Sequence, residues 1–163
     1  MDKKIIGVIF GATLLFLIGG IYFISGQDNS AQVQEDKNVK AYISETTFDW
    51  GEIGINNGKA EKTFDIKNEG TGMLKLSNIS TSCMCTTAQL ILDGKASPAF
   101  GMHQKSSYVM EVPPQKTAKL KVVFDPLYHG PDGVGAITRQ IKVETNDPGN
   151  PELDFMLTAT VRK

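Results

Sequence analysis

Cysteine and histidine are scarce in this sequence, with two residues of each among 163. Two cysteines cannot build a disulfide-rich scaffold, so the fold must rest on an apolar core. The formal net charge is only −1. That balance lacks the clustered positive surface that binding to nucleic acid or to anionic lipid headgroups would need. The net charge of the chain therefore does not indicate what this protein binds.

Catalytic signatures are also missing. The sequence contains no serine in a G-x-S-x-G motif, no H-E-x-x-H motif and no P-loop. The glycine-rich stretch His129–Gly135 lacks the Lys-Ser/Thr pair and the following helix that would bind phosphate. We therefore expect a protein that is not an enzyme.

Charge is absent from the twenty consecutive residues Ile5–Ile24. A helix of that length spans ~30 Å, the thickness of the hydrocarbon core of a bilayer. Lys3 and Lys4 precede it, and acidic residues dominate the stretch that follows. The positive-inside rule then predicts a cytoplasmic start at residues 1–4, a transmembrane helix at 5–24 and the remainder outside the cytoplasm. The lipid bilayer is thus an expected partner.

Two alternatives to this anchor remain open. A cleaved signal peptide would have an apolar region of roughly 7–15 residues that ends in a small-residue cleavage site. Here the apolar run is longer, and no A-x-A motif follows it. A helix buried in the core is the other alternative, and a fully apolar run at the extreme N-terminus does not favour it. Anchor and signal peptide both place the following domain outside the cytoplasm.

Residues 25–40 are polar and have no periodicity, which predicts a flexible tether. From residue 41 onward, short runs of alternating apolar and polar residues are separated by glycine, proline and asparagine. The clearest are Phe64–Lys67, Leu120–Phe124 and Leu153–Val161. We therefore expect residues 41–163 to form one all-β domain. Its fold is an immunoglobulin-like antiparallel β-sandwich of about seven strands.

Five motifs in order resemble the bacterial DUF1573 family of uncharacterised domains. They are Phe48–Ile53, Thr63–Gly70, Thr81–Ala88, Leu120–Pro126 and Val143–Pro151. The resemblance covers most of residues 43–161, and it implies an exported, often anchored domain with a fold of the ASH and major-sperm-protein type. It implies no established activity. The chain departs from the family pattern by a long insertion at residues 91–114 and by the unusual loop that contains His129.

The tripeptide Cys83-Met84-Cys85 is the strongest candidate site. If it is extended, both sulfur atoms lie on one face. The two Cα atoms would then be ~6.6 Å apart, near the upper limit for a disulfide, so a disulfide between them would be strained unless the strand turns there. Two thiolates on one face can instead hold a metal ion. The sequence also contains a C-x-C pair in place of the C-x-x-C motif of thioredoxin-type enzymes.

Both histidines lie in atypical loops. One loop contains His103 and its neighbour Met102, and the other contains His129. Thiolate, imidazole and thioether ligands favour copper, or zinc if the thioether does not bind. We therefore predict a metal site formed by Cys83, Cys85, Met102, His103 and His129.

Three functions remain open from the sequence. The first is an extracytoplasmic binding module that holds copper. The second is a structural or adhesive module that contacts other envelope proteins and binds no metal, with the sulfur atoms serving only the core. A thiol–disulfide enzyme that uses the C-x-C pair is a more distant third. The metal hypothesis requires the cysteines and histidines to meet at one end of the sandwich.

Overall fold

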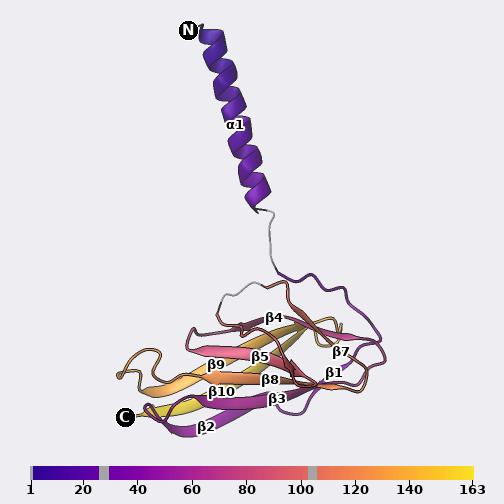
Figure 1. Cartoon of the computed structure of the whole chain (residues 1–163), viewed down its shortest axis with the longest axis vertical. Helices are drawn as coiled ribbons and strands as arrows, with labels where there is room; N and C mark the ends of the chain where they lie inside the picture. The colour runs from indigo at the N-terminus through magenta and orange to yellow at the C-terminus, as the bar shows by residue number, and fades with distance from the viewer. Residues whose placement is uncertain (1, 26–29, 103–105) are drawn as a thin grey trace.

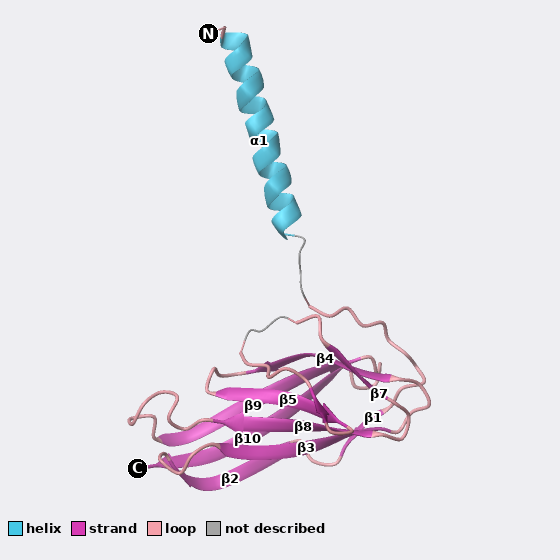
Figure 2. Ribbon diagram, in the orientation of Figure 1, coloured by secondary structure: helices cyan, strands magenta, loops and turns pink. Residues whose placement is uncertain are grey.

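The computed structural model describes residues 2–25, 30–102 and 106–163. One helix, α1 (Lys3–Ser25), extends from a β-sandwich (Figures 1 and 2). This confirms a helix across the predicted apolar segment. Within the described residues, no helix is long and apolar enough to cross a membrane. The transmembrane span predicted at residues 5–24 stays a prediction.

In the part of the chain that the structure describes, ten strands form two sheets of five strands each. The first sheet has the order β1-β3-β8-β5-β6, and the second has the order β2-β10-β9-β4-β7. The strands are β1 (Ala41–Ile43), β2 (Thr47–Gly54), β3 (Ala60–Asn68), β4 (Leu74–Thr81), β5 (Thr86–Leu92), β6 (Lys95–Ala96), β7 (Val109–Val112), β8 (Thr117–Phe124), β9 (Gly135–Thr145) and β10 (Glu152–Arg162). The immunoglobulin-like β-sandwich expected from the sequence is confirmed.

Two details of the predicted fold are wrong. The described residues form ten strands, where about seven were expected, partly because β1 and β6 have only three and two residues. The sheets are also not wholly antiparallel, since β2 runs parallel to β10. Parallel neighbours need a long connection, and here nearly the whole domain lies between the two strands.

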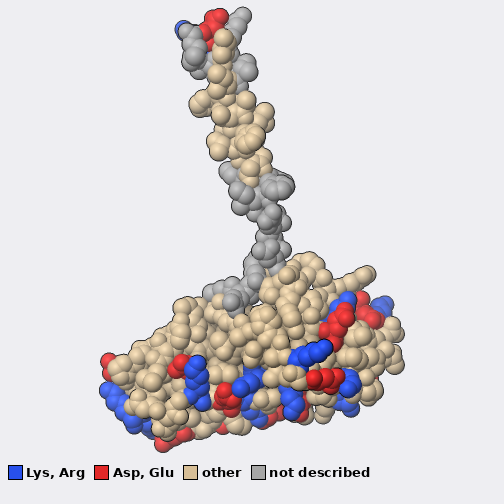
Figure 3. Space-filling view, viewed as in Figure 1, with Lys and Arg blue, Asp and Glu red and all other residues tan. Residues whose placement is uncertain are grey.

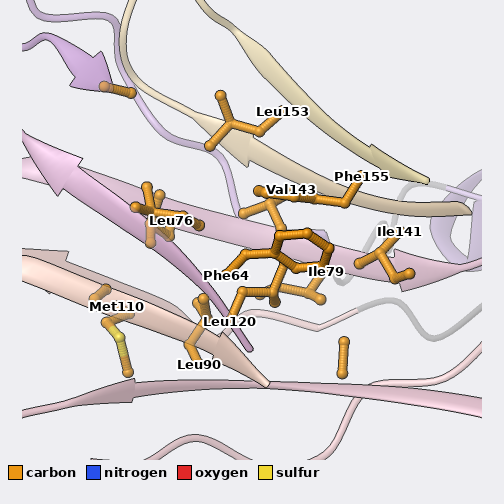
Figure 4. Close-up of a cluster of buried hydrophobic side chains, with 14 of the residues drawn as sticks. Phe64, Leu76, Ile79, Leu90, Met110, Leu120, Ile141, Val143, Leu153 and Phe155 are labelled. Atoms are coloured by element: carbon orange, nitrogen blue, oxygen red, sulfur yellow. The ribbon is translucent and has the colours of Figure 1, made fainter. Parts of the chain in front are cut away.

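The core fills the space between the two sheets, as Figure 4 shows. Alternation along the strands supplies it: Phe64 and Ile66 of β3 are buried, while Asp65 between them is exposed. The rings of Phe64 and Phe155, one from each sheet, have centroids 4.9 Å apart. Interdigitation of this kind holds two sheets face to face.

The segment predicted as a flexible tether is held against the sandwich from Ala31 onward. The backbone N–H of Ala31 donates to the carbonyl of Ser106 and to the side chain of Asn78. Further along, the carbonyl of Asn38 accepts hydrogen bonds from Thr71 and Gly72, and Val39 is buried in the core. A polar sequence without periodicity can still be ordered when its backbone groups find partners outside a regular ladder.

Charged side chains of both signs are interspersed over the lower part of the sandwich in Figure 3, in the region where Figure 1 shows β3 and β8. Pairs such as Lys121 with Glu61 and Lys67 with Glu69 lie within ion-pair distance. Exposed pairs of this kind contribute little stability each. They leave no single-signed patch on that face for a charged partner.

Candidate functional site

The two cysteines lie in a tight turn between β4 and β5, not in an extended strand. The N–H of Thr86 donates to the carbonyl of Cys83, and the Thr81 hydroxyl donates to the carbonyls of Cys83 and Thr86. The turn brings the Cα atoms of Cys83 and Cys85 to 5.3 Å, and the two residues form a disulfide. The tripeptide is therefore not extended: the chain turns there, which is the condition under which the sequence allowed a disulfide.

His129 reaches the same turn from the loop between β8 and β9. The pairing of Thr86 with Phe124 places the start of β5 beside the end of β8, and the N–H of Asp125 donates to the carbonyl of Cys85. The Nε2 atom of His129 lies 3.6 Å from the Sγ atom of Cys83. Figure 1 shows this loop at the end of the sandwich opposite β1 and β7.

Ligand atoms of Cys83, Cys85 and His129 all lie within 4.8 Å of one another. Cys85 is buried, Cys83 is half-buried and His129 is exposed. The convergence that the metal hypothesis requires is therefore found for these three residues. As a disulfide, however, the two sulfur atoms are not thiolates, and the thiolate is the form of cysteine that binds metals.

Met102 and His103 belong to the long connection between β6 and β7. The carbonyl of Gly101 accepts a hydrogen bond from the N–H of Thr81, two residues before Cys83, and Met102 itself is half-buried. His103 lies outside the described residues. Both stay predicted ligands, with the sequence as their only support.

Hydrophobic side chains surround the inner sulfur atom. Cys85 is only 2% exposed and packs with Ile55, Phe124 and Val161 in a second, smaller core cluster. Hydrogen-bond donors also face both sulfur atoms. The N–H of Cys85 lies 3.3 Å from the Sγ atom of Cys83, and the hydroxyl of the buried Thr86 lies 3.7 Å from the Sγ atom of Cys85.

A cationic side chain near this cluster, that of Arg139, was not among the site residues predicted from the sequence. The guanidinium carbon of Arg139 lies 5.1 Å from the centroid of the Phe124 ring, in cation–π range. Its Nε atom is buried and has no hydrogen-bond partner among the described residues, and burial lowers the pKa of the guanidinium. Alternation with Ile137 and Ile141 in β9 is the sequence signal that places Arg139 on the inner face.

A shallow pocket of about 320 Å³ lies elsewhere, on β2 and β10, and none of the predicted site residues lines it. Its lining includes Glu45, Phe48 and Met156. The nitrogen of Lys62 lies 4.0 Å from the centroid of the Phe48 ring and 2.6 Å from a carboxylate oxygen of Glu45. The chain's own lysine thus already satisfies the carboxylate and the aromatic face that a cationic ligand would use.

The fold of this domain is also found in a solved structure. A protein of unknown function from Porphyromonas gingivalis W83 is 20% identical, with a TM-score of 0.57 over 78% of this chain and 49% of that chain. The present chain thus spans about half the length of that protein. The ASH / PapD-like domain of human CEP192 (PapD-like domain 7) is 15% identical, with a TM-score of 0.49 over 80% of this chain and 91% of that domain. Identities this low speak of the fold alone.

The family comparison covers the first part of the sandwich. No curated protein sequence matches the chain. The DUF1573 family, described as "Protein of unknown function (DUF1573)", matches residues 41–97, from β1 to β6 with both cysteines included. The resemblance to the DUF1573 family predicted from the sequence motifs is therefore confirmed over residues 41–97.

Proposed function

We propose that this protein is a non-enzymatic binding module whose Cys83 and Cys85, once reduced, hold a soft metal ion together with His129. The observation that carries the proposal is the convergence of these three ligand atoms within 4.8 Å. Around a metal with bonds of 2.0–2.3 Å, neighbouring ligand atoms lie about 3.5–4 Å apart. Small side-chain rotations would bring the three atoms to those separations.

Copper is the ion that this ligand set favours. Thiolates are soft ligands that select Cu(I), and imidazole suits copper and zinc alike. Zinc almost always has four ligands in structural sites, whereas only three ligand atoms converge among the described residues, those of Cys83, Cys85 and His129. Met102, the predicted thioether ligand, would complete a copper site but is a poor ligand for zinc. Cu(I) is therefore the expected cargo, and Zn(II) is the comparison.

The test is metal retention by the full chain in detergent. The chain is reduced, separated from the reductant without oxygen, and loaded with Cu(I) or Zn(II) against a competing chelator. We expect one Cu(I) per chain in the native protein, none in the Cys83→Ser/Cys85→Ser variant, and weaker retention in His129→Ala. A native chain that releases all its copper to the chelator would refute the proposal.

The same proposal includes attachment to a membrane through α1, with the sandwich outside the cytoplasm. The twenty uncharged residues Ile5–Ile24 support it. So does the exposure of large apolar side chains along the helix, among them Phe10, Leu15 and Phe16, which are 74%, 73% and 87% exposed. Apolar surface of this extent is favourable only when something apolar covers it.

Fractionation of cells that make the full chain tests this part. Carbonate-resistant membrane association, with the sandwich digested by protease added from outside, is the expected result. Recovery of a soluble protein that has lost residues 1–25 would mean a cleaved signal peptide instead. If the added protease cannot digest the sandwich after the outer barrier of the cells has been opened and the cytoplasmic membrane is still closed, the proposed orientation is wrong.

A structural or adhesive envelope module is the second candidate function. One observation favours it: Cys85 packs among Ile55, Phe124 and Val161 as a buried hydrophobic residue would. In that case the sulfur atoms serve the core, and the Cys83→Ser/Cys85→Ser variant loses stability but no bound ion. The metal-retention experiment separates the two functions.

A further inference from the structure

The two sulfur atoms of the disulfide differ sharply in their surroundings. Cys83 is half-buried and contacts the exposed imidazole of His129, whereas Cys85 is only 2% exposed. Thiol–disulfide exchange proceeds by attack of a thiolate on one sulfur atom, and access decides which one is attacked. In this turn an incoming thiolate can reach Cys83, and Cys85 is the leaving group.

A hydrogen-bond donor lies close to the sulfur atom of Cys85, which becomes the leaving thiolate. The Thr86 hydroxyl lies 3.7 Å from the Sγ atom of Cys85 and is fully buried. Such a hydroxyl can turn its proton toward the sulfur atom once negative charge develops there, and a hydrogen bond to a charged group is stronger than one to a neutral group. The N–H of Cys85 serves the Sγ atom of Cys83 in the same way, at 3.3 Å.

Exposed apolar side chains lie in the two segments that form the site, the cysteine turn and the β8–β9 loop. Met84 is 54% exposed within the turn, and Leu127, Tyr128 and Val134 of the β8–β9 loop are 45%, 48% and 44% exposed. The rings of Tyr128 and His129 are in edge contact, with centroids 5.2 Å apart. These four residues, called the sulfur rim below, are four of the seven large exposed apolar side chains that the described part of the sandwich carries.

We propose that Cys83–Cys85 is a reversible disulfide that is reduced by a partner protein carrying a dithiol, and that this partner docks on the sulfur rim. Exposed apolar residues gathered on two segments that meet at Cys83 and His129 indicate a site of protein contact. The disulfide in the same turn as Met84 indicates which chemistry the partner must bring. A small reductant needs no such surface, whereas a protein thiol must be held against Cys83.

The exchange balances as two displacements. A thiolate of the partner attacks the Sγ atom of Cys83, the intramolecular S–S bond breaks, and its electron pair leaves on Cys85. The second thiolate of the partner then attacks the partner's own sulfur in the mixed disulfide and releases Cys83 as a thiolate. Two electrons pass from the partner, which becomes a disulfide, to this chain. The two thiol protons of the partner pass to solvent or to the reduced pair.

The exchange would control the proposed metal site. The oxidised pair offers no thiolate ligand, and reduction creates both thiolates beside His129. Only this consequence rests on the proposed function. The exchange itself requires no metal, so it can be tested, and can fail, independently of copper binding.

Reduction of the oxidised full chain in detergent by two reagents tests the proposal. The reagents are reduced thioredoxin, as the protein dithiol, and dithiothreitol at the same dithiol concentration. Alkylation and mass measurement follow the free thiols with time. We expect faster reduction by thioredoxin. The Leu127→Ser/Tyr128→Ser variant should lose about tenfold or more of that rate, as removal of interface anchors does, with an unchanged dithiothreitol rate.

The variant Tyr42→Ser is the matched control, because Tyr42 is also 48% exposed but lies in β1 at the other end of the sandwich. It should react like the native chain. Equal rates with both reagents, or a rim variant that reacts with thioredoxin as fast as the native chain, would overturn the docking surface.

A trapping experiment tests which sulfur atom is attacked. Thioredoxin whose second active-site cysteine is replaced by serine should stop at a mixed disulfide with Cys83, as peptide mass mapping would show. Thr86→Val, which removes the hydroxyl but keeps the shape, should slow reduction by both reagents, and Thr86→Ser should restore the rate. A mixed disulfide on Cys85, or none at all, would refute the proposed exchange.

Discussion

The Nε2 atom of His129 lies 3.6 Å from the Sγ atom of Cys83, although 46 positions separate the two residues in the sequence. Strand pairing produces this contact. Because β5 and β8 are neighbours in register from Thr86 opposite Phe124, the turn before β5 and the loop after β8 leave the same end of the sheet. The imidazole and the sulfur pair therefore meet on a rigid scaffold, where functional loops are commonly placed.

We expect reduction of the disulfide to leave the domain folded. The bridge joins residues only two positions apart, and the entropic stabilisation by a disulfide grows with the length of the loop it closes. For so short a loop the free energy of unfolding should fall by about 1.5 kcal/mol. Urea unfolding of the oxidised and the reduced chain, followed by tryptophan fluorescence, measures the difference. A reduced chain without a cooperative transition would show instead that the bridge is required for folding.

Phe64 should be a core position that is sensitive to truncation. Its side chain is 2% exposed, and its ring lies 4.9 Å from that of Phe155 in the opposite sheet. Phe64→Ala removes this contact and leaves a cavity, which should lower the free energy of unfolding by about 3–5 kcal/mol. Tyr42→Ala, at an exposed position, should cost less than about 1 kcal/mol. Similar losses in the two variants would contradict the packing.

Alternation along the chain was sufficient to predict the principal strands of both sheets. The runs around Phe64, Leu120 and Phe155 have one apolar face, and each of these residues is buried as expected. The shortest strands were not predicted, because two or three residues are too few to show an alternation of apolar and polar side chains. The parallel pairing of β2 with β10 was not predicted either, since pairing between distant segments depends on the whole topology and not on local pattern.

The candidate site shows the same division between local and long-range information. The C-x-C pair and His129 were visible as residue types, and strand order brought them together. Whether the chain turns at Cys83 stayed open, because the hydrogen bonds of the turn come from Thr81 and Thr86, and threonine is also common in strands. The sulfur rim was missed because single apolar residues in loops are ordinary until their neighbours in space are known.

Asp147 should make the domain sensitive to acid. Burial would raise the pKa of this carboxyl, but hydrogen bonds from the Asn150 side chain and from the backbone N–H groups of Ala41 and Gly149 outweigh burial and lower the pKa. A folded-state pKa below the unfolded value of about 3.9 means that the carboxylate stabilises the fold above that pH. The contribution is lost as the pH falls through the folded-state value.

Asp147→Asn should therefore lose about 1–3 kcal/mol of unfolding free energy at pH 7. The deficit relative to the native chain should shrink at pH 3, because this pH lies below the unfolded-state pKa of about 3.9, where the stabilisation by the carboxylate is already partly lost. Urea unfolding at both pH values measures this, with Asp65→Asn on an exposed strand face as the control. A deficit that is the same at both pH values would mean that shape, not charge, matters at this position.

Asn78 should hold the segment before β1 against the sandwich. This residue lies at an irregularity in the pairing of β4 with β9 and has a φ of 46°, in the left-handed region that asparagine tolerates. Its side chain accepts a hydrogen bond from the N–H of Ala31 and donates to the carbonyl of Ala31 and to Glu144. Asn78→Gly keeps the backbone conformation accessible but removes all three hydrogen bonds.

We expect Asn78→Gly to speed hydrogen exchange and proteolysis of residues 30–39 while the amides of β8 keep their protection, because the loss is local. Asn78→Ala should do the same and also destabilise the whole domain by about 1–2 kcal/mol, since alanine is strained at positive φ. The difference between the two variants separates the role of the side chain from that of the backbone. Unchanged exchange of residues 30–39 in Asn78→Gly would mean that the bond from Ala31 to the carbonyl of Ser106 holds the segment by itself.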